Sequence, residues 1–209
     1  MPPKSNYSKF VDQRNHVLHR PDTAVGSIVF KKMMQWICVT DASLGLSIQS
    51  RQTDFNPGLE RIFLEIISNA HDNVIRSQDS KTPVKHIDVV VSDEYIEVYN
   101  DGLGIRLVEV SDENGEVIKG SLAPEVIFGE LLSGSNFDDS VVRNTSGRNG
   151  YGAKVTNILS KKFSVEAYDE ESGQVFSKTW TDNMGKKGDT KIVKGKGKTG
   201  WTRVRFEPD

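Results

Sequence analysis

The clearest pattern in the sequence is an apolar stripe that repeats every three or four residues between positions 57 and 76. This spacing matches the period of an α-helix, about 3.6 residues, and gives the segment one broad apolar face. Pro57 suits the first helical position, where no backbone N–H is needed. The stripe therefore predicts a helix over 57–76 that packs against a core. Its apolar members are Leu59, Ile62, Phe63, Ile66, Ile67, Ala70 and Val74.

Elsewhere, apolar and polar residues alternate over short segments bounded by turn residues, which is typical of β-strands. We expect strands at 26–40, 44–55, 85–91, 95–99, 162–169, 174–183, 190–195 and 201–208, and further helices from Pro124 and over 151–160. The polar stretch 111–121 predicts a hairpin or a mobile loop. Because strands and helices do not alternate regularly, an α/β sandwich with a largely antiparallel sheet is favoured. Tyr7, Trp36, Trp180 and Trp201 are expected to pack in the core.

The composition excludes several classes of protein. The 209 residues carry 27 Lys and Arg against 29 Asp and Glu, a formal net charge of −2, which is unlike a domain that binds nucleic acid directly. The single cysteine, Cys38, excludes an internal disulfide framework and a zinc site built on paired cysteines. No apolar run approaches the roughly 18 residues of a membrane span, and the first residues lack a signal-peptide core. We expect a soluble, intracellular protein without membrane contact.

Four polar residues of the predicted helix border its apolar face. Glu65, Asn69, Asp72 and Asn73 follow one another at helical spacing and form a second stripe beside the apolar one. The simpler interpretation is a solvated helix edge. The alternative is the floor of a site, where a carboxylate takes a proton from water and a carboxamide oxygen ligates Mg²⁺, a cation that prefers oxygen ligands.

The stretch IEVYNDGLGI places Asn100 at the end of a predicted strand, with Gly102 and Gly104 after it. A polar side chain there can pair with a nucleobase edge, and the glycines let the backbone approach a ring closely. Asn-Asp-Gly is also favourable turn chemistry. Considered alone, the plain turn is the simpler interpretation.

The stretch NTSGRNGYGAKVTNIL, residues 144–159, runs from a glycine-rich loop into a predicted helix. Free backbone N–H groups at a helix start attract anions, so the loop is a candidate phosphate site or simply a flexible segment. It is not a Walker A motif, because Ala153 stands before Lys154 where that motif needs glycine. The Gly-Lys-Thr at 197–199 also lacks the motif's first glycine. The basic segment around it is expected to be a solvated edge strand or hairpin.

In this order, the three motifs resemble the GHKL (Bergerat) ATP-binding fold of gyrase, the ninety-kilodalton heat-shock chaperone, histidine kinases and MutL. RPDTAVGS, PGLERIFLEIISNAHDN, PEVIFGELLSGSNFDD and SGRNGYGAKVTNILSKKF narrow the resemblance to the ATPase domain of eukaryotic-type DNA topoisomerase II. The resemblance implies a two-layer α/β sandwich with a mixed, mainly antiparallel sheet and helices on one face. It also implies an N-terminal arm over 1–20 and an ATP-binding domain over 21–209. The transducer and DNA-cleavage domains are then expected outside this chain.

By position, the resemblance also implies site residues. Glu65 is implied to be the general base that orients the attacking water, Asn69 the Mg²⁺ ligand, and Asn100 the residue that recognises the adenine amino group. Residues 147–154 are implied to wrap the β- and γ-phosphates. The residues implied in nucleotide binding are Asn69, Asn73, Asn100, Gly102, Gly104, Ser135, Asn136, Gly147, Arg148, Asn149, Gly150, Tyr151, Gly152, Ala153 and Lys154.

The function implied is that of an ATP- and Mg²⁺-dependent gate. ATP binding joins two copies of the domain and is coupled to DNA double-strand passage elsewhere in the full-length enzyme. The implied partners are a second copy and double-stranded DNA, and the implied location is the nucleus for a cellular source and the cytoplasm or the virion for a viral one. Two alternatives stay open, a MutL-like or chaperone-like ATPase and a nucleotide sensor without turnover, which would have no use for Glu65. One departure is Arg106, where members of the family usually carry proline.

Overall fold

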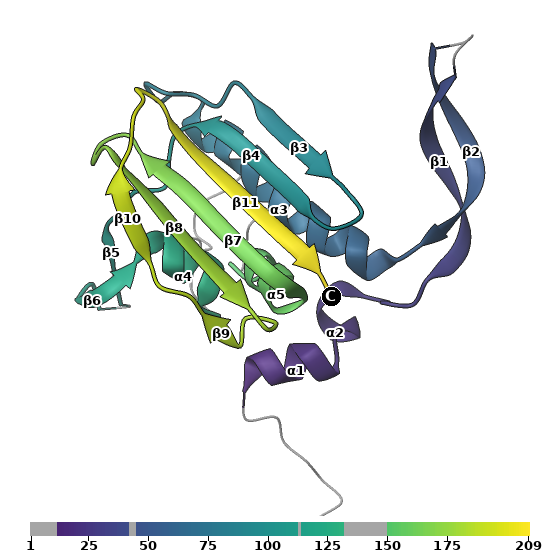
Figure 1. The fold of residues 1–209 in the computed structure, drawn as a ribbon, viewed down its shortest axis with the longest axis horizontal. Helices are drawn as coiled ribbons and strands as arrows, with labels where there is room; N and C mark the ends of the chain where they lie inside the picture. Colours follow the sequence, from purple (N-terminus) through teal and green to yellow (C-terminus); the bar gives the residue numbers. More distant parts are fainter. Residues whose placement is uncertain (1–11, 42–44, 113, 132–149) are drawn as a thin grey trace, which may run out of the picture.

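The computed structural model describes residues 12–41, 45–112, 114–131 and 150–209. These segments form a two-layer body, an antiparallel sheet with helices on one face, and a separate hairpin that stands away from it (Figure 1). The predicted fold class, a sandwich with a mainly antiparallel sheet, is confirmed. No helix in the described segments is both long and apolar enough to cross a membrane.

The main sheet has the strand order β10-β8-β7-β11-β4-β3, and β9 also pairs with β8. Its pairings are antiparallel. β11, the last strand in the sequence, lies between β7 and β4. The strands are β3 (Ile87–Val91), β4 (Ile96–Gly102), β7 (Ser160–Asp169), β8 (Gln174–Thr181), β9 (Lys186–Lys187), β10 (Lys191–Lys194) and β11 (Gly200–Pro208).

The long helix predicted from the apolar stripe is α3 (Pro57–Ser77). It begins where the side chain of Asn56 accepts a hydrogen bond from the Leu59 N–H at 3.1 Å, which satisfies one of the unpaired donors of the first turn. Ile62 and Ile66 are buried, whereas Leu59 in the first turn is exposed. The remaining helices are α1 (Gln13–His19), α2 (Asp22–Val25), α4 (Ala123–Gly129) and α5 (Gly152–Ile158).

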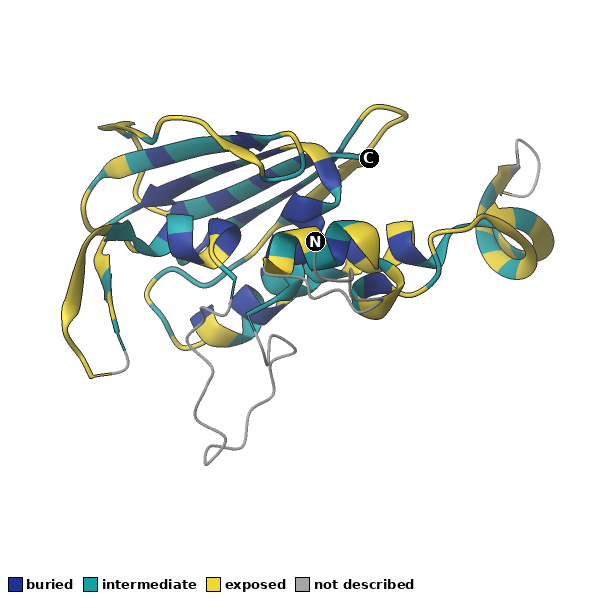
Figure 2. Cartoon of the chain, turned by 90° about the horizontal axis from the view of Figure 1, so that it is seen from below, coloured by how far each residue is buried: buried dark blue, intermediate teal, exposed yellow. Residues whose placement is uncertain are grey.

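The core lies between the sheet and the helices. Phe163 on β7 is fully buried, and its ring lies 6.2 Å from Phe128, 6.1 Å from Trp180 and 6.5 Å from Phe206. Figure 2 shows the consequence along the strands, where buried positions alternate with partly exposed ones. The prediction that Trp180 packs in the core is confirmed. Trp201 is only partly buried.

The first two predicted strands form a hairpin of their own, β1 (Lys31–Asp41) and β2 (Gly45–Phe55), outside the main sheet. Trp36 on β1 is 75% exposed, so the prediction that it packs in the core is wrong. Ile48 on β2 is 71% exposed. Alternation of apolar residues predicts a strand with an apolar face, but it does not say which sheet the strand joins or what covers that face. Tyr7 lies outside the described residues.

β4 ends later than predicted. The pattern places its end at Tyr99 and assigns the next residues to a loop, but the strand continues through Gly102. It continues because both neighbouring strands pair with it beyond Tyr99: β3 as far as Asn100, which lies opposite Ile87, and β11 as far as Gly102, which lies opposite Gly200. Asn100 is therefore held in the sheet.

β8 ends earlier than predicted, at Thr181. The next three residues, Asp182, Asn183 and Met184, have φ of 57°, 53° and 64°. A left-handed turn of this kind is costly for residues other than glycine and cannot continue a strand. The guanidinium of Arg14 on α1 donates to the carbonyls of Asp182 at 2.7 Å and Asn183 at 2.6 Å, which holds the turn against the first helix.

Two polar segments are as expected. The stretch 111–121 belongs to a hairpin of β5 (Glu109–Ser111) and β6 (Val117–Leu122), which confirms the hairpin alternative. The basic segment near the end contains β10, an exposed strand at one edge of the main sheet with Lys191 and Lys194 at its ends. The predicted edge strand is confirmed.

Candidate functional site

A cavity of about 510 Å³ lies between helix α3, the inner face of the sheet and the start of α5. Its volume is in the range of small-molecule sites, roughly 300–1,000 Å³. The apolar part of its lining includes Ile66 and Ala70 of α3 and Val98 and Val204 of the sheet. The polar lining residues are Arg61, Glu65, Asn69, Asp72, Asn73, Arg76, Asn100, Tyr151, Lys154 and Thr202.

The polar stripe of α3 faces this cavity. Glu65, Asn69, Asp72 and Asn73 all line it, so the interpretation as a purely solvated helix edge is wrong. The Glu65 carboxylate is 24% exposed and pairs with the guanidinium of Arg61, one helical turn earlier, at 2.5 Å. The stripe lies on the border between the apolar face and the cavity, because helical spacing turns all four side chains to one side.

The sheet contributes a buried carboxamide. Asn100 is 4% exposed, lines the cavity and donates from Nδ2 to the Asp101 carbonyl at 2.9 Å. Thr202, directly opposite on β11, also lines the cavity. Gly102 lies away from the lining: its φ is 99°, and an added Cβ would lie 2.6 Å from the backbone of Val84. The structure thus accounts for this glycine by its conformation and its packing.

The loop after β4 forms one wall of the cavity. Leu103 and Gly104 line it, and the carbonyl of Leu103 accepts a hydrogen bond from Nδ2 of Asn73 at 2.9 Å. The Gly104 N–H donates to the carboxylate of Glu170 at 3.1 Å. No side chain would fit at Gly104, because its Cβ would overlap the Tyr168 carbonyl. The glycine allows the wall to lie against the end of β7.

The start of α5 forms the opposite side of the cavity. Lys154 is fully buried, and burial lowers the pKa of its ammonium to about 8 although the negative charge of Glu130 acts in the other direction. Gly152 lies against Glu65, since an added Cβ would overlap the Glu65 carboxylate. Burial raises the pKa of the Tyr151 hydroxyl. The lining residues from this segment are Gly150, Tyr151, Gly152, Ala153, Lys154 and Val155.

Five of the predicted site residues lie outside the described residues: Ser135, Asn136, Gly147, Arg148 and Asn149. The other predicted residues, apart from Gly102, line one cavity although they come from three separate segments of the chain. Across the described part of the chain, no three His, Cys, Asp or Glu side chains gather as a metal site.

Sequence reasoning missed three polar lining residues. Arg61 and Arg76 lie on α3 at helical spacing from Glu65 and Asn73, so the helical pattern contained the signal for both. Thr202 could not be found in this way. It reaches the cavity only because β11 pairs in register with β4, and that pairing joins distant parts of the sequence.

The polar groups of the cavity are chemically diverse. A carboxylate and a carboxamide one helical turn apart, Glu65 and Asn69, lie on α3, and a buried ammonium lies on α5. Asn100 offers both a donor and an acceptor on the sheet side of the cavity, beside the apolar side chains of Val98 and Val204 and opposite Thr202. This combination suits a ligand with a planar hydrogen-bonding ring and an anionic group.

No protein-family model matches the chain. DNA topoisomerase 2-alpha of Mus musculus is 39% identical over 197 residues, which cover 94% of this chain and 12% of that protein. DNA topoisomerase 2 of Invertebrate iridescent virus 6 is 38% identical over an alignment of 211 positions, which covers 99% of this chain and 18% of that protein. The crystal structure of the ATPase region of Saccharomyces cerevisiae topoisomerase II is 40% identical, with a TM-score of 0.83, over 97% of this chain and 50% of that chain.

This chain therefore spans less than a fifth of the length of these curated relatives and half of the length of the solved ATPase region. Within that span the similarity extends over nearly the whole chain. It confirms the GHKL fold and the resemblance that the motifs indicated.

Proposed function

We propose, since this chain is a relative of the ATPase regions of type II DNA topoisomerases, that it binds ATP with Mg²⁺ in the described cavity and hydrolyses it. One observation carries the proposal: the cavity brings together Glu65 of α3, Asn100 of β4 and Lys154 of α5. These are a carboxylate, a carboxamide and an ammonium, which are the groups needed for water activation, base recognition and phosphate binding.

Asn100 is the proposed adenine-binding residue. Its carboxamide is buried in the cavity, where the amide oxygen can accept from an exocyclic amino group and the amide nitrogen can donate to a ring nitrogen. The wall formed by Leu103 and Gly104 lets the backbone approach a flat ring closely. Guanine presents an oxygen where adenine presents its amino group, so we expect adenine to be preferred.

Lys154 and the α3 stripe are proposed to bind the phosphates and the metal. A buried ammonium attracts an anion strongly, because few water molecules screen it. Asn69 faces the cavity with an oxygen ligand of the kind that Mg²⁺ prefers, so the residues present fit this ion. When bound, Mg²⁺ neutralises phosphate charge. The glycine-rich residues before Gly150 remain predicted phosphate ligands.

Glu65 is the proposed general base. Its carboxylate is largely shielded, lies against Gly152 and is held by Arg61 at 2.5 Å. A base in this position takes the proton of a water molecule as that water attacks the terminal phosphate. Arg61 keeps the carboxylate oriented from one turn earlier on the same helix.

The activity of the whole protein is proposed from the relationship alone. In a full-length enzyme, ATP-dependent pairing with a second copy would be coupled to passage of double-stranded DNA. The nucleus as its location in a cellular eukaryote, and the division into an arm over 1–20 and an ATP-binding domain over 21–209, stay predictions.

The test is to measure ATP binding by calorimetry and hydrolysis under single-turnover conditions with Glu65→Gln. We expect this variant to bind ATP and to lose about 10²–10⁴-fold in rate, the usual loss on removal of a general base. Glu60→Gln is the matched control, because Glu60 is an exposed carboxylate on the same helix. Hydrolysis by Glu65→Gln at the wild-type rate would refute the assignment. Binding without any turnover in the wild-type chain would favour the nucleotide-sensor alternative.

A further inference from the structure

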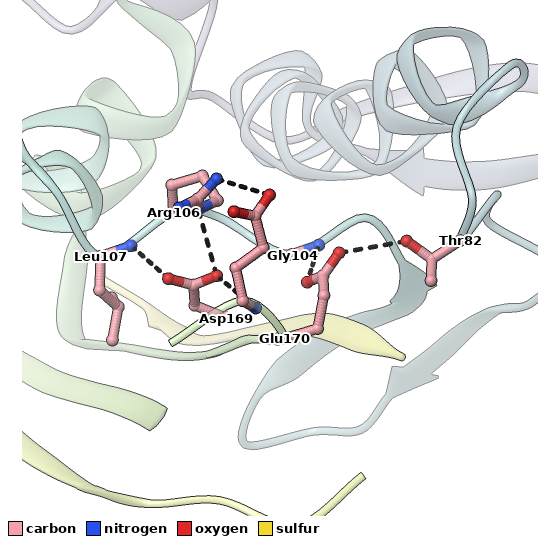
Figure 3. Close-up of polar contacts among 7 residues, drawn as sticks. Thr82, Gly104, Arg106, Leu107, Asp169 and Glu170 are labelled. Carbon is pink, nitrogen blue, oxygen red and sulfur yellow. Dashed lines mark hydrogen bonds and ion pairs between the residues drawn. The ribbon is translucent and has the colours of Figure 1, made fainter. Parts of the chain in front are cut away.

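We propose that Arg106 and three consecutive acidic residues, Asp169, Glu170 and Glu171, position the cavity wall so that it is ready to receive a nucleotide. The cavity wall here means residues 103–107, and the three acidic residues are called the acidic turn. The proposal rests on the proposed function, since it concerns the affinity of the same cavity for ATP. Figure 3 shows the contacts between the two segments.

Asp169 is the central residue of the acidic turn. Its carboxylate is 1% exposed and accepts hydrogen bonds from the backbone N–H of Leu107 at 3.0 Å and of Glu171 at 3.1 Å. Nε of Arg106 lies 3.3 Å from the same carboxylate. Burial acts to raise the pKa of Asp169, but these backbone hydrogen bonds, a hydrogen bond from the Ser172 side chain and the Arg106 charge together outweigh it and lower the pKa. The carboxylate is thus ionised at neutral pH, and it holds the cavity wall at Leu107.

Glu170 holds the cavity wall at Gly104. One carboxylate oxygen accepts from the Gly104 N–H at 3.1 Å, and the other accepts from the Thr82 hydroxyl at 3.1 Å. Behind Gly104 there is no free space, because Tyr168 and Gly200 lie directly against it. Two acidic side chains that are neighbours in the sequence therefore fix two backbone N–H groups of the wall, three residues apart.

Arg106 supplies the cation that this arrangement needs. Its side chain is 45% exposed, and besides Asp169 it pairs with Glu171 at 2.6 Å. A buried carboxylate that loses its cation keeps its hydrogen bonds but loses the opposite charge that helps to compensate its own. Arg106 and the acidic turn therefore form one connected cluster of ion pairs and hydrogen bonds on the outer side of the cavity wall.

The wall matters for the ligand because its inner side lines the cavity. Leu103, Gly104 and Ile105 face the cavity, while the outer side of the same loop carries the contacts to the acidic turn. A wall that is ordered before binding loses less conformational entropy when the ligand arrives, which favours affinity. Arg106 itself does not line the cavity, so its proposed role is that of a positioning residue.

The experiment titrates the β,γ-imido analogue of ATP with Mg²⁺ into the wild-type chain, Arg106→Ala, Arg106→Lys and Asp169→Asn. Amide hydrogen exchange of Leu107 and Gly104 is measured in the same proteins without nucleotide. The control is Lys162→Ala, because Lys162 is an exposed cation that pairs with Glu207 at 3.7 Å, and neither residue lines the cavity.

We expect Arg106→Ala to bind the analogue about three- to tenfold more weakly and to exchange Leu107 faster, with Arg106→Lys recovering part of both effects. The double variant Arg106→Ala/Asp169→Asn should bind no more weakly than Asp169→Asn alone, because the two residues act together. Lys162→Ala should match the wild-type chain.

Wild-type affinity and wild-type exchange in Arg106→Ala would overturn the proposal. Equal losses in Arg106→Lys and Arg106→Ala would also contradict a role for the cation. If the wild-type chain does not bind the analogue at all, the proposed function fails. The exchange of Leu107 then still decides whether Arg106 orders the wall.

Discussion

Replacing Gly152 by alanine is a direct test of the site, because it adds a methyl group where Glu65 lies. Gly152 is the first residue of α5, and alanine suits a helix better than glycine by up to about 1 kcal/mol. The added Cβ would overlap the carboxylate and lie 2.9 Å from Cγ of Glu65. Carbon atoms in contact are separated by about 3.5–4.0 Å, so Cγ must withdraw by roughly 0.5–1 Å. The carboxylate beyond it must move further.

The fold should tolerate this change, since the displaced atoms are at the end of a flexible side chain. We expect the melting temperature of Gly152→Ala to stay close to that of the wild-type chain, and we compare turnover at saturating ATP because Gly152 also lines the cavity. Turnover should fall by about 10²-fold, because a catalytic group displaced by about 1 Å loses roughly this factor. The effect depends on Glu65, so Gly152→Ala/Glu65→Gln should be no slower than Glu65→Gln alone.

The assay is hydrolysis of labelled ATP with protein in excess, together with calorimetric titration and thermal unfolding of each variant. Wild-type turnover in Gly152→Ala would show that the position of the Glu65 carboxylate is not critical. A further loss in the double variant would show that Gly152 acts through something other than Glu65. Either result would refute the reasoning.

Three further predictions concern recognition, pH dependence and stability. Asn100→Ala should weaken ATP binding by about 1–3 kcal/mol and reduce the preference over GTP, measured by calorimetry; unchanged affinity would contradict the adenine assignment. Because burial lowers the pKa of Lys154 from 10.5 to about 8, the unfolded chain binds more protons than the folded chain between these values, and stability rises with pH across that window. Lys154→Met should flatten this rise, by on the order of 3 kcal/mol in urea unfolding from pH 7.5 to 10.5; an unaltered slope would contradict it. Phe163→Ala should cost about 3–5 kcal/mol, against less than about 0.5 kcal/mol for the exposed Trp36→Ala, and equal costs would show that the core is misassigned.

The α3 part of the site could be predicted from the sequence because one helix carries all its members. Helical spacing alone places Glu65, Asn69 and Asn73 on one side, and no tertiary contact is needed to bring them together. The sheet part is different. Asn100 was recognised only through a motif, and Thr202 was not recognised at all, because its place depends on the register between two strands far apart in the sequence.

The hairpin and the cavity wall show two further limits. The alternating pattern around Trp36 predicts strands correctly, but an exposed apolar face and a buried one have the same pattern. The sequence alone did not indicate a structural role for Arg106, which is a single arginine in a predicted loop. Its partners, Asp169 and Glu171, are distant in the sequence and reach Arg106 only because the end of β7 packs against the loop. Contacts between distant segments decide both cases.

The central place of β11 has a consequence for how the protein is made. During translation, β4 and β7 leave the ribosome before β11, which pairs with both of them. Until β11 emerges, each of the earlier strands presents an unpaired edge, and such edges are open to pairing with other chains. Because these contacts join distant parts of the chain, we expect the sheet to close late and slowly. A nascent chain that stops before Gly200 thus lacks the strand that carries Thr202 to the cavity, and nucleotide binding can report that synthesis has passed this point.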